Sequence, residues 1–597
     1  MHATWVGASL VALAIGVIAL VRTPRPWAAL AAIAVIAVAT VLAPAWSKAL
    51  FTLGSYRAAV LLHAGITTGS AAIADLEKKE SANRLVFYRE GLHGVVSVHE
   101  TPGDPPELSL RVNGKSDAST GGDMATQVFL GHIPMLFAPP NATVCVIGQG
   151  SGVTARAALE HAPRRLTVVE LEPAVLQASR LFDAWSDTVL ADPRVEVVVE
   201  DGRQHLQHSG RTYDVIVSEP SNPWVAGVNN LFTVDFYRRV RAALAPRGVF
   251  CQWIQAYEIS PAALGSLFRS FAQVFPDAEV FLVNFDFVIV APPAGAKVPA
   301  SSLFLESRNN AVADYLRRFH LDGNGAVAGT HLASLATLAE SFPAVPLNTD
   351  DRPYVEYRAP IDLYQPPALA DLWTTVTTQP LADLARWVRA EDVDSVACQA
   401  GLNMARRAHW RRASLIASEL REKGGDGPAL AAQVENLAAR GQQVAQVATL
   451  VDEAAKALAA GDTQTLKDDL SRALALDPEH PAANLLAARI ATQAGALDQA
   501  RRYLAVAIRA ESPVDRSAAF VNLGLIEMRE GNAPAGYRAF ASARAAAPGE
   551  AEPYVYLSRW QTAAGHPDSA RAVLQQGLAA ARSKPPIQSE LARLGAR

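Results

Sequence analysis

Cysteine and histidine are sparse in this chain of 597 residues. It has three cysteines, Cys145, Cys251 and Cys398, and their scatter excludes a disulfide framework and a cysteine-based zinc site. The 13 histidines show no metal-ligand spacing, so we expect no metal site. Charged residues make up only 19% of the chain, the net charge is −4, and no basic stripe stands out. The composition therefore gives no reason to expect nucleic-acid binding.

Half of the residues are hydrophobic, and the excess lies at the N-terminus. Residues 5–21 and 27–44 contain no charged residue, and each run approaches the roughly 17 to 25 residues that cross a bilayer. We therefore predict a hairpin of two transmembrane helices over residues 1–46. A cleaved signal peptide is the alternative, although no lysine or arginine precedes the first run and a second run follows at once. Basic residues in the hairpin turn and after it leave the orientation nearly balanced.

Two strand patterns follow this segment. Residues 84–90, 94–100 and 107–112 alternate like short strands, which predicts a β unit within a linker region at 47–140. Over residues 141–365, apolar strands alternate with helices, which indicates an α/β fold with a doubly wound, mainly parallel sheet of the class I methyltransferase-like (Rossmann-like) type. The expected strands are 143–147, 166–171, 195–199, 213–217, 249–253, 278–283 and 287–291, the last two forming an antiparallel hairpin at the sheet edge.

After residue 366 the strand pattern gives way to alanine- and leucine-rich amphipathic helices. Gly461, Gly495, Gly531 and Gly565 recur at intervals of 34, 36 and 34 residues, and Pro478, Pro513 and Pro548 recur at 35. This period resembles tetratricopeptide repeats, in which each helical hairpin buries its apolar face against its neighbours. We assign residues 451–597 to such an all-α solenoid and 366–450 to a helical connector. An irregular helical bundle is the alternative.

Three strand ends carry the first signs of chemistry. The loop VIGQGSGVT follows one strand and opens a helix, so its glycines would let the backbone approach a ligand at free helical N–H groups. Glu170 ends the next strand, 22 residues after Gly148, where nucleotide-binding folds place an acid for the ribose hydroxyls. Asp201 follows the third strand and is expected to accept from an adenine amino group. The nucleoside-binding candidates are Gly148, Gly150, Ser151, Gly152, Glu170, Asp201 and Gly202.

The fourth strand runs into the loop SEPSNPW, residues 218–224, where an acid is followed by two prolines that fix the chain. In this order and at these spacings, the motifs resemble those of the spermidine synthase (polyamine aminopropyltransferase) family, over about residues 85–292. The resemblance implies that an amine displaces methylthioadenosine from decarboxylated S-adenosylmethionine, the co-substrate. It implies that Glu219 is the catalytic carboxylate, which takes the proton of the attacking amine or prepares this amine electrostatically, and that Gln127 contacts the donor.

Departures from the family pattern concern amine recognition. Ser151 replaces an aspartate of the glycine loop, Asn222 replaces the second loop acid, and Thr126 replaces a tyrosine. Loss of acids lowers the electrostatic cost of admitting an intact S-adenosylmethionine, which carries a carboxylate. The remaining substrate-site candidates are Asp117, Asp123, Trp224 and Tyr237. Each also has a structural interpretation: Asp117 and Asp123 as surface acids, Trp224 as a domain contact and Tyr237 as a core residue.

Three functions from different classes remain open. The first is aminopropyl transfer to a polyamine such as putrescine. The second keeps the nucleoside site but cleaves, cyclises or methylates with intact S-adenosylmethionine. The third is a membrane-tethered interaction protein whose repeats bind a protein partner and whose sheet senses a nucleoside.

Two further segments, LNTDDRP at 347–353 and residues 44–57, resemble a membrane-fused bacterial subgroup of the family. This likeness implies a bacterial inner membrane location with the catalytic and repeat domains in the cytoplasm. For LNTDDRP itself, we favour a capped turn that covers the sheet.

Overall fold

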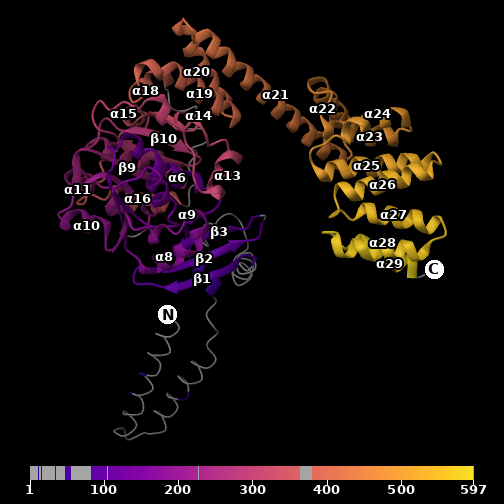
Figure 1. The fold of residues 1–597 in the computed structure, drawn as a ribbon, viewed down its shortest axis with the longest axis horizontal. Coiled ribbons are helices and arrows are strands. Elements are labelled where there is room, and N and C mark those ends of the chain that lie inside the picture. The colour runs from indigo at the N-terminus through magenta and orange to yellow at the C-terminus, as the bar shows by residue number, and fades with distance from the viewer. Residues whose placement is uncertain are drawn as a thin grey trace. The chain divides into compact units, whose positions relative to one another are not determined.

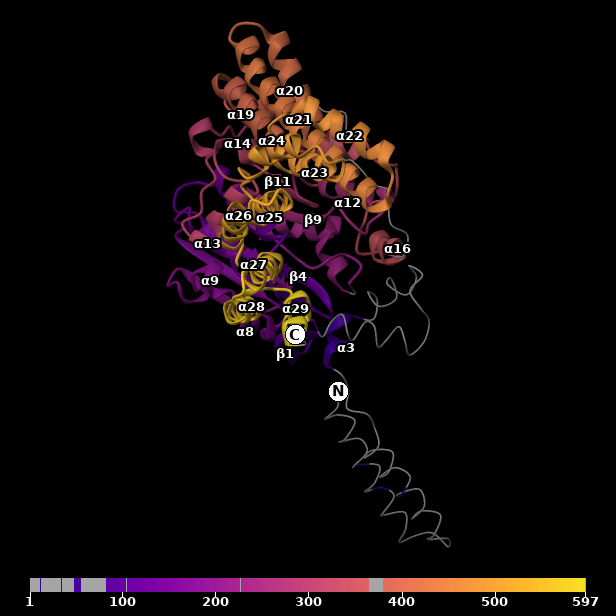
Figure 2. The same ribbon diagram turned by 90° about the vertical axis from the view of Figure 1, so that its right-hand side faces the viewer.

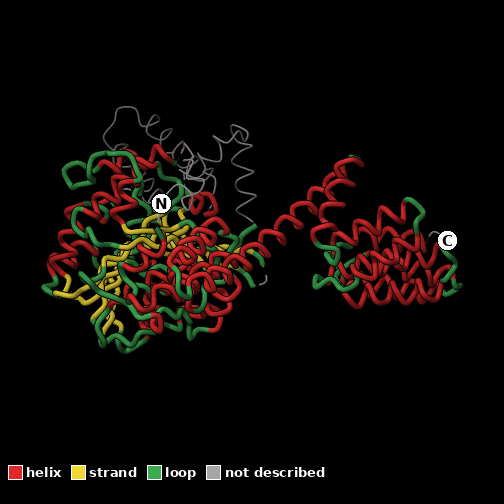
Figure 3. Tube along the Cα trace, turned by 90° about the horizontal axis from the view of Figure 1, so that it is seen from above, coloured by secondary structure: helices red, strands yellow, loops and turns green. Residues whose placement is uncertain are grey.

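The computed structural model describes residues 11, 15, 34, 48–54, 82–103, 105–225, 227–363 and 379–595 (Figure 1). The chain divides into two compact units, Met1–Ala438 and Ala439–Arg597. The strands gather in the first unit, whereas the described part of the second is helical (Figure 3).

Within the described residues, no helix is both long and apolar enough to cross a membrane. The two spans predicted within residues 1–46 lie outside the described residues, apart from Val11, Ile15 and Ala34. The predicted transmembrane hairpin therefore gains no support from the structure.

A small antiparallel sheet precedes the main domain. Its strands, in spatial order, are β1 (Arg84–Glu90), β2 (Val95–Thr101), β3 (Glu107–Val112) and β4 (Lys115–Ser119). The first three confirm the predicted β unit, whereas β4 was missed because its sequence, KSDAS, is mostly polar. Val96, Val98 and Leu110 share a buried cluster with α8 (Pro173–Ala178), so this sheet packs on the domain that follows it (Figure 1). The short helix α3 (Lys48–Leu53) contacts β2.

The main sheet has eight strands in the order β12-β10-β11-β9-β8-β5-β6-β7. The strands from β9 to β7 are parallel, and β11, β10 and β12 are added antiparallel at one side. The seven predicted strands are confirmed, but the hairpin is not the edge, because β12 pairs outside it. Their bounds are β5 (Thr143–Ile147), β6 (Arg165–Glu170), β7 (Val195–Val199), β8 (Tyr213–Ser218), β9 (Leu244–Gln255), β10 (Glu279–Val283), β11 (Asp286–Ala291) and β12 (His331–Ser334).

Helices cover both faces of this sheet because its central strands are apolar on both sides. Alternate residues of β5 enter different cores, Val144 and Val146 on one face and Cys145 and Ile147 on the other. The first face is covered by α6 (Met124–His132), α7 (Val153–Leu159), α13 (Asn310–Arg318) and α14 (Asn324–Thr330). The second is covered by α10 (Gly202–His208), α11 (Val234–Ala243), α12 (Pro261–Ala272), α15 (Leu335–Glu340) and α16 (Tyr354–Asp362). The one-turn α9 (Asp183–Ser186) contacts α7 and α13.

Three helices after residue 379, and the start of a fourth, pack on the first face of the sheet. They are α18 (Pro380–Ala385), α19 (Val393–Arg406), α20 (Trp410–Lys423) and the start of α21 (Gly427–Ala460). Trp387, which is 1% exposed, meets the Phe281 ring edge-on at 5.6 Å. The described part of the region assigned to a connector, from residue 379 to Ala438, therefore contributes to the core of the first unit.

The second unit consists of helices that pack against their neighbours in chain order (Figure 2). After the end of α21 come α22 (Thr463–Leu476), α23 (Pro481–Gln493), α24 (Leu497–Ala507), α25 (Pro513–Arg529), α26 (Ala533–Ala546), α27 (Glu552–Ala563), α28 (Pro567–Ala580) and α29 (Pro585–Gly595). The four periodic glycines lie between helices with φ from 76° to 83°, a conformation that glycine adopts without strain. The repeat period in the sequence therefore reflects a repeated helix ending.

Candidate functional site

The glycine loop lies between β5 and α7 at the carboxyl end of the parallel strands. Gly148, Gly150 and Gly152 have φ of 98°, 49° and 86°, which disfavour any other residue. A Cβ at position 148 would lie 2.5 Å from the carbonyl oxygen of Glu219. The loop thus needs glycine at position 148 for a close approach to the segment that follows β8.

Glu170 ends β6 beside this loop and is 8% exposed. Its two carboxylate oxygens accept from the backbone N–H groups of Gln149 and Glu172, both at 2.9 Å. Burial raises the pKa of Glu170, and these two hydrogen bonds oppose the rise. Each oxygen keeps a further lone pair, so the carboxylate can still accept from a ribose hydroxyl.

Asp201 and Gly202 lie where β7 passes into α10. Asp201 is the N-cap residue, and its Oδ1 accepts from the Gln204 N–H at 2.8 Å. A Cβ at position 202 would lie 2.4 Å from Cγ2 of Ile147 at the end of β5. Asp201 therefore fixes the start of α10, and Gly202 permits close packing of this helix on the sheet. Both residues lie at the strand end where the sequence analysis places the adenine.

Gln127 joins the small sheet to the glycine loop. Its Nε2 donates to the Ser119 carbonyl at 3.0 Å, and its Oε1 accepts from the Ser151 hydroxyl. The Thr154 hydroxyl donates to the backbone carbonyl of Gln127 at 3.1 Å. Gln127 and Ser151, both predicted from the sequence, thus lie together, but they bond to each other rather than pointing freely at a ligand.

Glu219 follows β8, and its backbone N–H donates to the Ile147 carbonyl at 3.0 Å. Burial raises the pKa of Glu219 to about 8. The charges of Asp123 and Asp286 raise it further, whereas the Thr154 hydroxyl and Lys115 lower it. A carboxylate with this pKa can exchange a proton near neutral pH.

Asp117 and Asp123, the two acids of the segment 117–123, lie in the cluster of charged residues around Glu219, which also contains Lys115 and Asp286. Asp117 pairs with Lys115 at 2.8 Å and accepts from the Ser221 hydroxyl at 2.7 Å. Asp123 accepts from the Ser119 hydroxyl, and burial raises the pKa of Asp123. The sequence left open that these were surface acids, and the structure places both among the charged groups around Glu219.

The other acceptor-site candidates lie in different surroundings. Asn222 is fully buried, and its amide partly offsets the rise in the pKa of Tyr257 that burial causes. Trp224 is partly buried and packs against the second core. Tyr237 is fully buried in that core, with its ring 4.9 Å from the Phe271 ring. Tyr237 is therefore a core residue and not part of the cluster around Glu219.

Asp286 is the residue that the sequence reasoning missed. It begins β11, is 7% exposed, and its Oδ2 accepts from the Thr126 hydroxyl at 2.8 Å. Burial raises the pKa of Asp286 to about 7. A signal was present, because Asp286 lies between the apolar stretches 280–283 and 287–291, and an acid is seldom buried there without a partner or a function. Among the described residues, no three His, Cys, Asp or Glu side chains are placed to hold a metal ion.

The segment LNTDDRP holds the chain that follows Glu219. Asn348 is fully buried, and its Nδ2 donates to Oδ1 of Asn229 at 2.9 Å and to the Phe232 carbonyl at 3.0 Å. Its Oδ1 accepts from the Val355 N–H at 3.2 Å. Asp350 accepts from Arg203 and from the Thr233 hydroxyl. These contacts agree with the interpretation of the segment as a structural turn.

Replacement of Asn348 by alanine is expected to destabilise the first unit by about 2–4 kcal/mol. The variant leaves buried polar groups without partners, each at a cost of about 1–3 kcal/mol. Urea unfolding of the full chain, followed by tryptophan fluorescence, measures the change. Asn230→Ala, at an exposed neighbour, is the control and should change stability by less than about 0.5 kcal/mol. Equal effects of the two substitutions would contradict the structural role.

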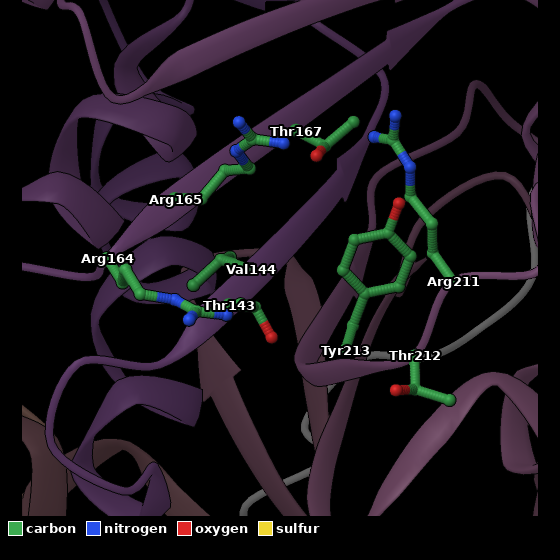
Figure 4. A pocket seen from close by; sticks show the side chains of 8 residues that line it. All are labelled: Thr143, Val144, Arg164, Arg165, Thr167, Arg211, Thr212 and Tyr213. Atoms are coloured by element: carbon green, nitrogen blue, oxygen red, sulfur yellow. The ribbon is translucent and has the colours of Figure 1, made fainter.

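A cavity of about 590 Å³ lies at the opposite end of the parallel strands (Figure 4). It is lined by Thr143, Val144, Arg164, Arg165, Thr167, Arg211, Thr212 and Tyr213. Arg211 binds Glu196 at 2.8 Å, and Arg165 lies 3.5 Å from the same carboxylate. A single carboxylate, that of Glu196, therefore pairs with two of the three arginines that line this cavity.

Comparison with known proteins identifies two regions of the chain. The sequence model of the spermine/spermidine synthase domain matches residues 124–288, and that of the tetratricopeptide repeat matches residues 457–519. Polyamine aminopropyltransferase of Bacillus subtilis (strain 168) is 29% identical over 176 residues, which is 29% of this chain and 63% of the relative. The enzyme of the same name from Moorella thermoacetica is 30% identical over 156 residues, covering 26% and 55% of the two chains.

Solved structures include a spermidine synthase in complex with the transition state analogue AdoDATO, at 23% identity and a TM-score of 0.32, covering 35% of this chain and 73% of that one. A probable spermidine synthase from Corynebacterium glutamicum has 18% identity and a TM-score of 0.31, with 44% and 96% covered. The chain spans less than two thirds of the length of the two curated relatives. Residues 124–288 are therefore a spermine/spermidine synthase domain, joined in one chain to a tetratricopeptide repeat.

Proposed function

We propose that this protein transfers an aminopropyl group from decarboxylated S-adenosylmethionine to an amine and releases methylthioadenosine. The observation that carries the proposal is the position of Glu219. It follows β8 directly, touches the glycine loop through its backbone, and has a carboxylate whose pKa lies near neutrality. The names of the curated relatives support the same reaction.

In the proposed reaction, the acceptor nitrogen forms a bond to the methylene carbon next to the sulfonium. The carbon–sulfur bond breaks, its electrons return to sulfur, and neutral methylthioadenosine leaves. The acceptor arrives as an ammonium ion, which has no free lone pair. The Glu219 carboxylate is suited to bind this cation and to accept one proton from it before the attack. The product nitrogen then carries the positive charge that the sulfonium loses.

The residues around the glycine loop fit the nucleoside of the donor. Gly148 and Gly150 bring the backbone close, and Glu170 offers free lone pairs to ribose hydroxyls. Asp117 lies near enough to Glu170 to raise its pKa further, so two acids flank this place. Adjacent carboxylates suit a donor that carries a sulfonium and an ammonium group.

Use of intact S-adenosylmethionine is the second candidate, and Lys115 is the observation that favours it. Lys115 is 7% exposed, and its ammonium group lies over the Trp253 ring at 5.2 Å from the ring centroid. A buried ammonium in this cluster could offset the carboxylate of the intact donor. Its pairing with Asp117 at 2.8 Å argues for the decarboxylated donor instead.

Product analysis distinguishes the two reactions. Purified protein is incubated with decarboxylated or intact S-adenosylmethionine, with and without putrescine, and the products are identified by mass spectrometry. Aminopropyl transfer predicts methylthioadenosine and a polyamine enlarged by one aminopropyl group, formed only from the decarboxylated donor. Methylthioadenosine from the intact donor without an amine would instead show a lyase or cyclase, and no turnover would contradict both.

The pH dependence of kcat/KM should follow Glu219. The pKa of Glu219 is raised, so the free protein holds this carboxyl protonated and inactive as a base below about pH 8. We therefore expect kcat/KM to rise with pH, approaching tenfold per unit well below pH 8, and to level off above it. Initial rates from pH 6 to pH 9.5 at low acceptor concentration measure the profile. A flat profile below pH 8 would contradict the role of Glu219 as the base.

The repeat unit is proposed to bind a protein partner. The match to a tetratricopeptide repeat and the stacked helices support this, because such arrays present extended binding surfaces. Pull-down with the full chain and with a chain whose α25–α26 surface is altered would test it; equal recovery of the same partners would count against binding there.

A further inference from the structure

The cavity shown in Figure 4 lies where three adjacent strands of the main sheet begin. Thr143, Arg165 and Tyr213 are the first residues of β5, β6 and β8, which lie side by side in the order β8-β5-β6. Glu219 directly follows the other end of β8. At about 3.3 Å per residue, the two ends of this strand are roughly 20 Å apart. The cavity is therefore separate from the cluster around Glu219.

Three guanidinium groups line this cavity from two sides. Arg164 and Arg165 lie on one side of the view in Figure 4, and Arg211 lies on the other. Arg211 binds both carboxylate oxygens of Glu196, at 2.8 and 3.1 Å, which fixes its orientation. Arg165 reaches the same carboxylate only at 3.5 Å, and Arg164 is exposed and forms no ion pair within the described part of the chain. Arg164 and Arg165 therefore keep N–H donors that a ligand can use.

Positive charge exceeds negative charge at this cavity. Among the described residues, two carboxylates bind side chains that line it, those of Glu196 and Asp214. Oδ2 of Asp214 accepts from the backbone N–H and from the hydroxyl of Thr143, both at 2.8 Å. Three arginines thus face two carboxylates, and arginine stays charged in proteins. The remaining charge favours an anionic ligand over a neutral or cationic one.

The wall between the arginines is fixed, and the cavity has the size of a small-molecule site. Thr167 is fully buried and Tyr213 is 3% exposed. The Tyr213 hydroxyl lies 2.8 Å from Nε2 of His205 on α10, which holds the ring in place. A volume of about 590 Å³ falls within the usual range for small ligands. The net charge of −4 and the lack of a basic stripe argue against a nucleic acid.

The guanidinium group suits one class of anion in particular. It is planar, and its forked N–H donors match two oxygens of a phosphate group. We infer that this cavity binds a phosphate group, free or carried by a small molecule, with Arg164 and Arg165 as donors and Arg211 adding positive charge from the opposite side. The inference does not depend on the proposed aminopropyl transfer, because it uses no residue of the cluster around Glu219.

Titration calorimetry of the full chain with inorganic phosphate tests this inference. Potassium chloride keeps the ionic strength constant, because salt screens exposed charges. We expect the wild type to bind phosphate, and Arg164→Gln and Arg165→Gln each to weaken binding by a factor on the order of ten, since each removes a hydrogen bond between charged groups. Arg164→Lys keeps the charge without the fork and should give an intermediate affinity. Arg180→Gln, at an exposed arginine outside the cavity, is the matched control and should bind as the wild type does.

Glycerol 3-phosphate distinguishes the two sources of the phosphate group. Binding of this ester that the same variants weaken would assign the site to a phosphorylated small molecule, and binding of inorganic phosphate alone would assign it to the free ion. Urea unfolding of each variant shows whether a loss of binding reflects a loss of structure.

Three results would overturn the inference. The first is the absence of binding for both probes. The second is equal weakening by Arg164→Gln and Arg180→Gln, which would show only a general effect of charge. The third is displacement of phosphate by methylthioadenosine, which would place the anion near Glu219.

Discussion

Replacing Glu219 by glutamine is expected to lower kcat/KM for aminopropyl transfer by a factor on the order of 10² to 10⁴, the usual contribution of a general base. Glutamine keeps the shape of the side chain but neither accepts the proton nor attracts the ammonium form of the acceptor. The buried surroundings that raise the pKa of Glu219 also make the substitution tolerable for folding, since a neutral amide costs less to bury than a carboxylate. Initial rates with putrescine, together with calorimetric affinity for methylthioadenosine, measure the effect.

Glu196→Gln is the matched control for this variant. Glu196 lies on β7 and pairs at the surface with Arg211 at 2.8 Å. The control therefore makes the same change from carboxylate to amide, but at a residue outside the cluster around Glu219. A surface ion pair contributes about 0–1 kcal/mol, and activity should remain within about twofold. Should Glu219→Gln retain more than a tenth of the wild-type kcat/KM, another group must accept the proton, and the proposed mechanism would be wrong.

The second large effect is expected from Glu170→Ala, which should weaken methylthioadenosine binding by a factor on the order of 100 and destabilise the first unit. The substitution removes the acceptors for the backbone N–H groups of Gln149 and Glu172. Each buried donor left without a partner costs about 1–3 kcal/mol. It also removes the carboxylate proposed for the ribose hydroxyls, so loop geometry and ligand contact are lost together. Titration calorimetry and urea unfolding measure the two effects separately.

Glu170→Gln is the intermediate variant in this experiment, because it removes only part of the hydrogen bonding of Glu170. Its single amide oxygen can keep the hydrogen bond to Gln149 N–H but lacks the second oxygen that Glu172 N–H uses. We expect an intermediate loss of stability and of affinity. If Glu170→Ala were destabilised while its affinity for methylthioadenosine stayed unchanged, Glu170 would be a structural residue of the loop and the ribose contact would be rejected.

The sequence by itself determined the strand–helix alternation, the glycine loop and the acid after β8. These are local patterns: strands apolar on both faces read as continuous apolar runs, and glycines at positive φ repeat wherever a helix ends in the same way. It also predicted that Glu170 and Glu219 lie beside the glycine loop, because their places in the chain follow the order of the strand ends. Their roles in binding and catalysis stay predictions. The expected transmembrane hairpin and its location in a bacterial inner membrane stay predictions.

Only the tertiary structure decided which of the remaining candidates lie together. Tyr237 lies in the core because α11 packs Phe236 and Tyr237 against Phe250 and Phe271. The helical spacing of the sequence does not determine which face of α11 is buried. Asp286 joined the site because β11 inserts between β9 and β10, bringing a residue 67 positions after Glu219 onto the same face. Sheet order is set by the pairing of distant strands, which no window of sequence contains. For that reason the place of Glu219 could be predicted from the sequence, and that of Asp286 could not.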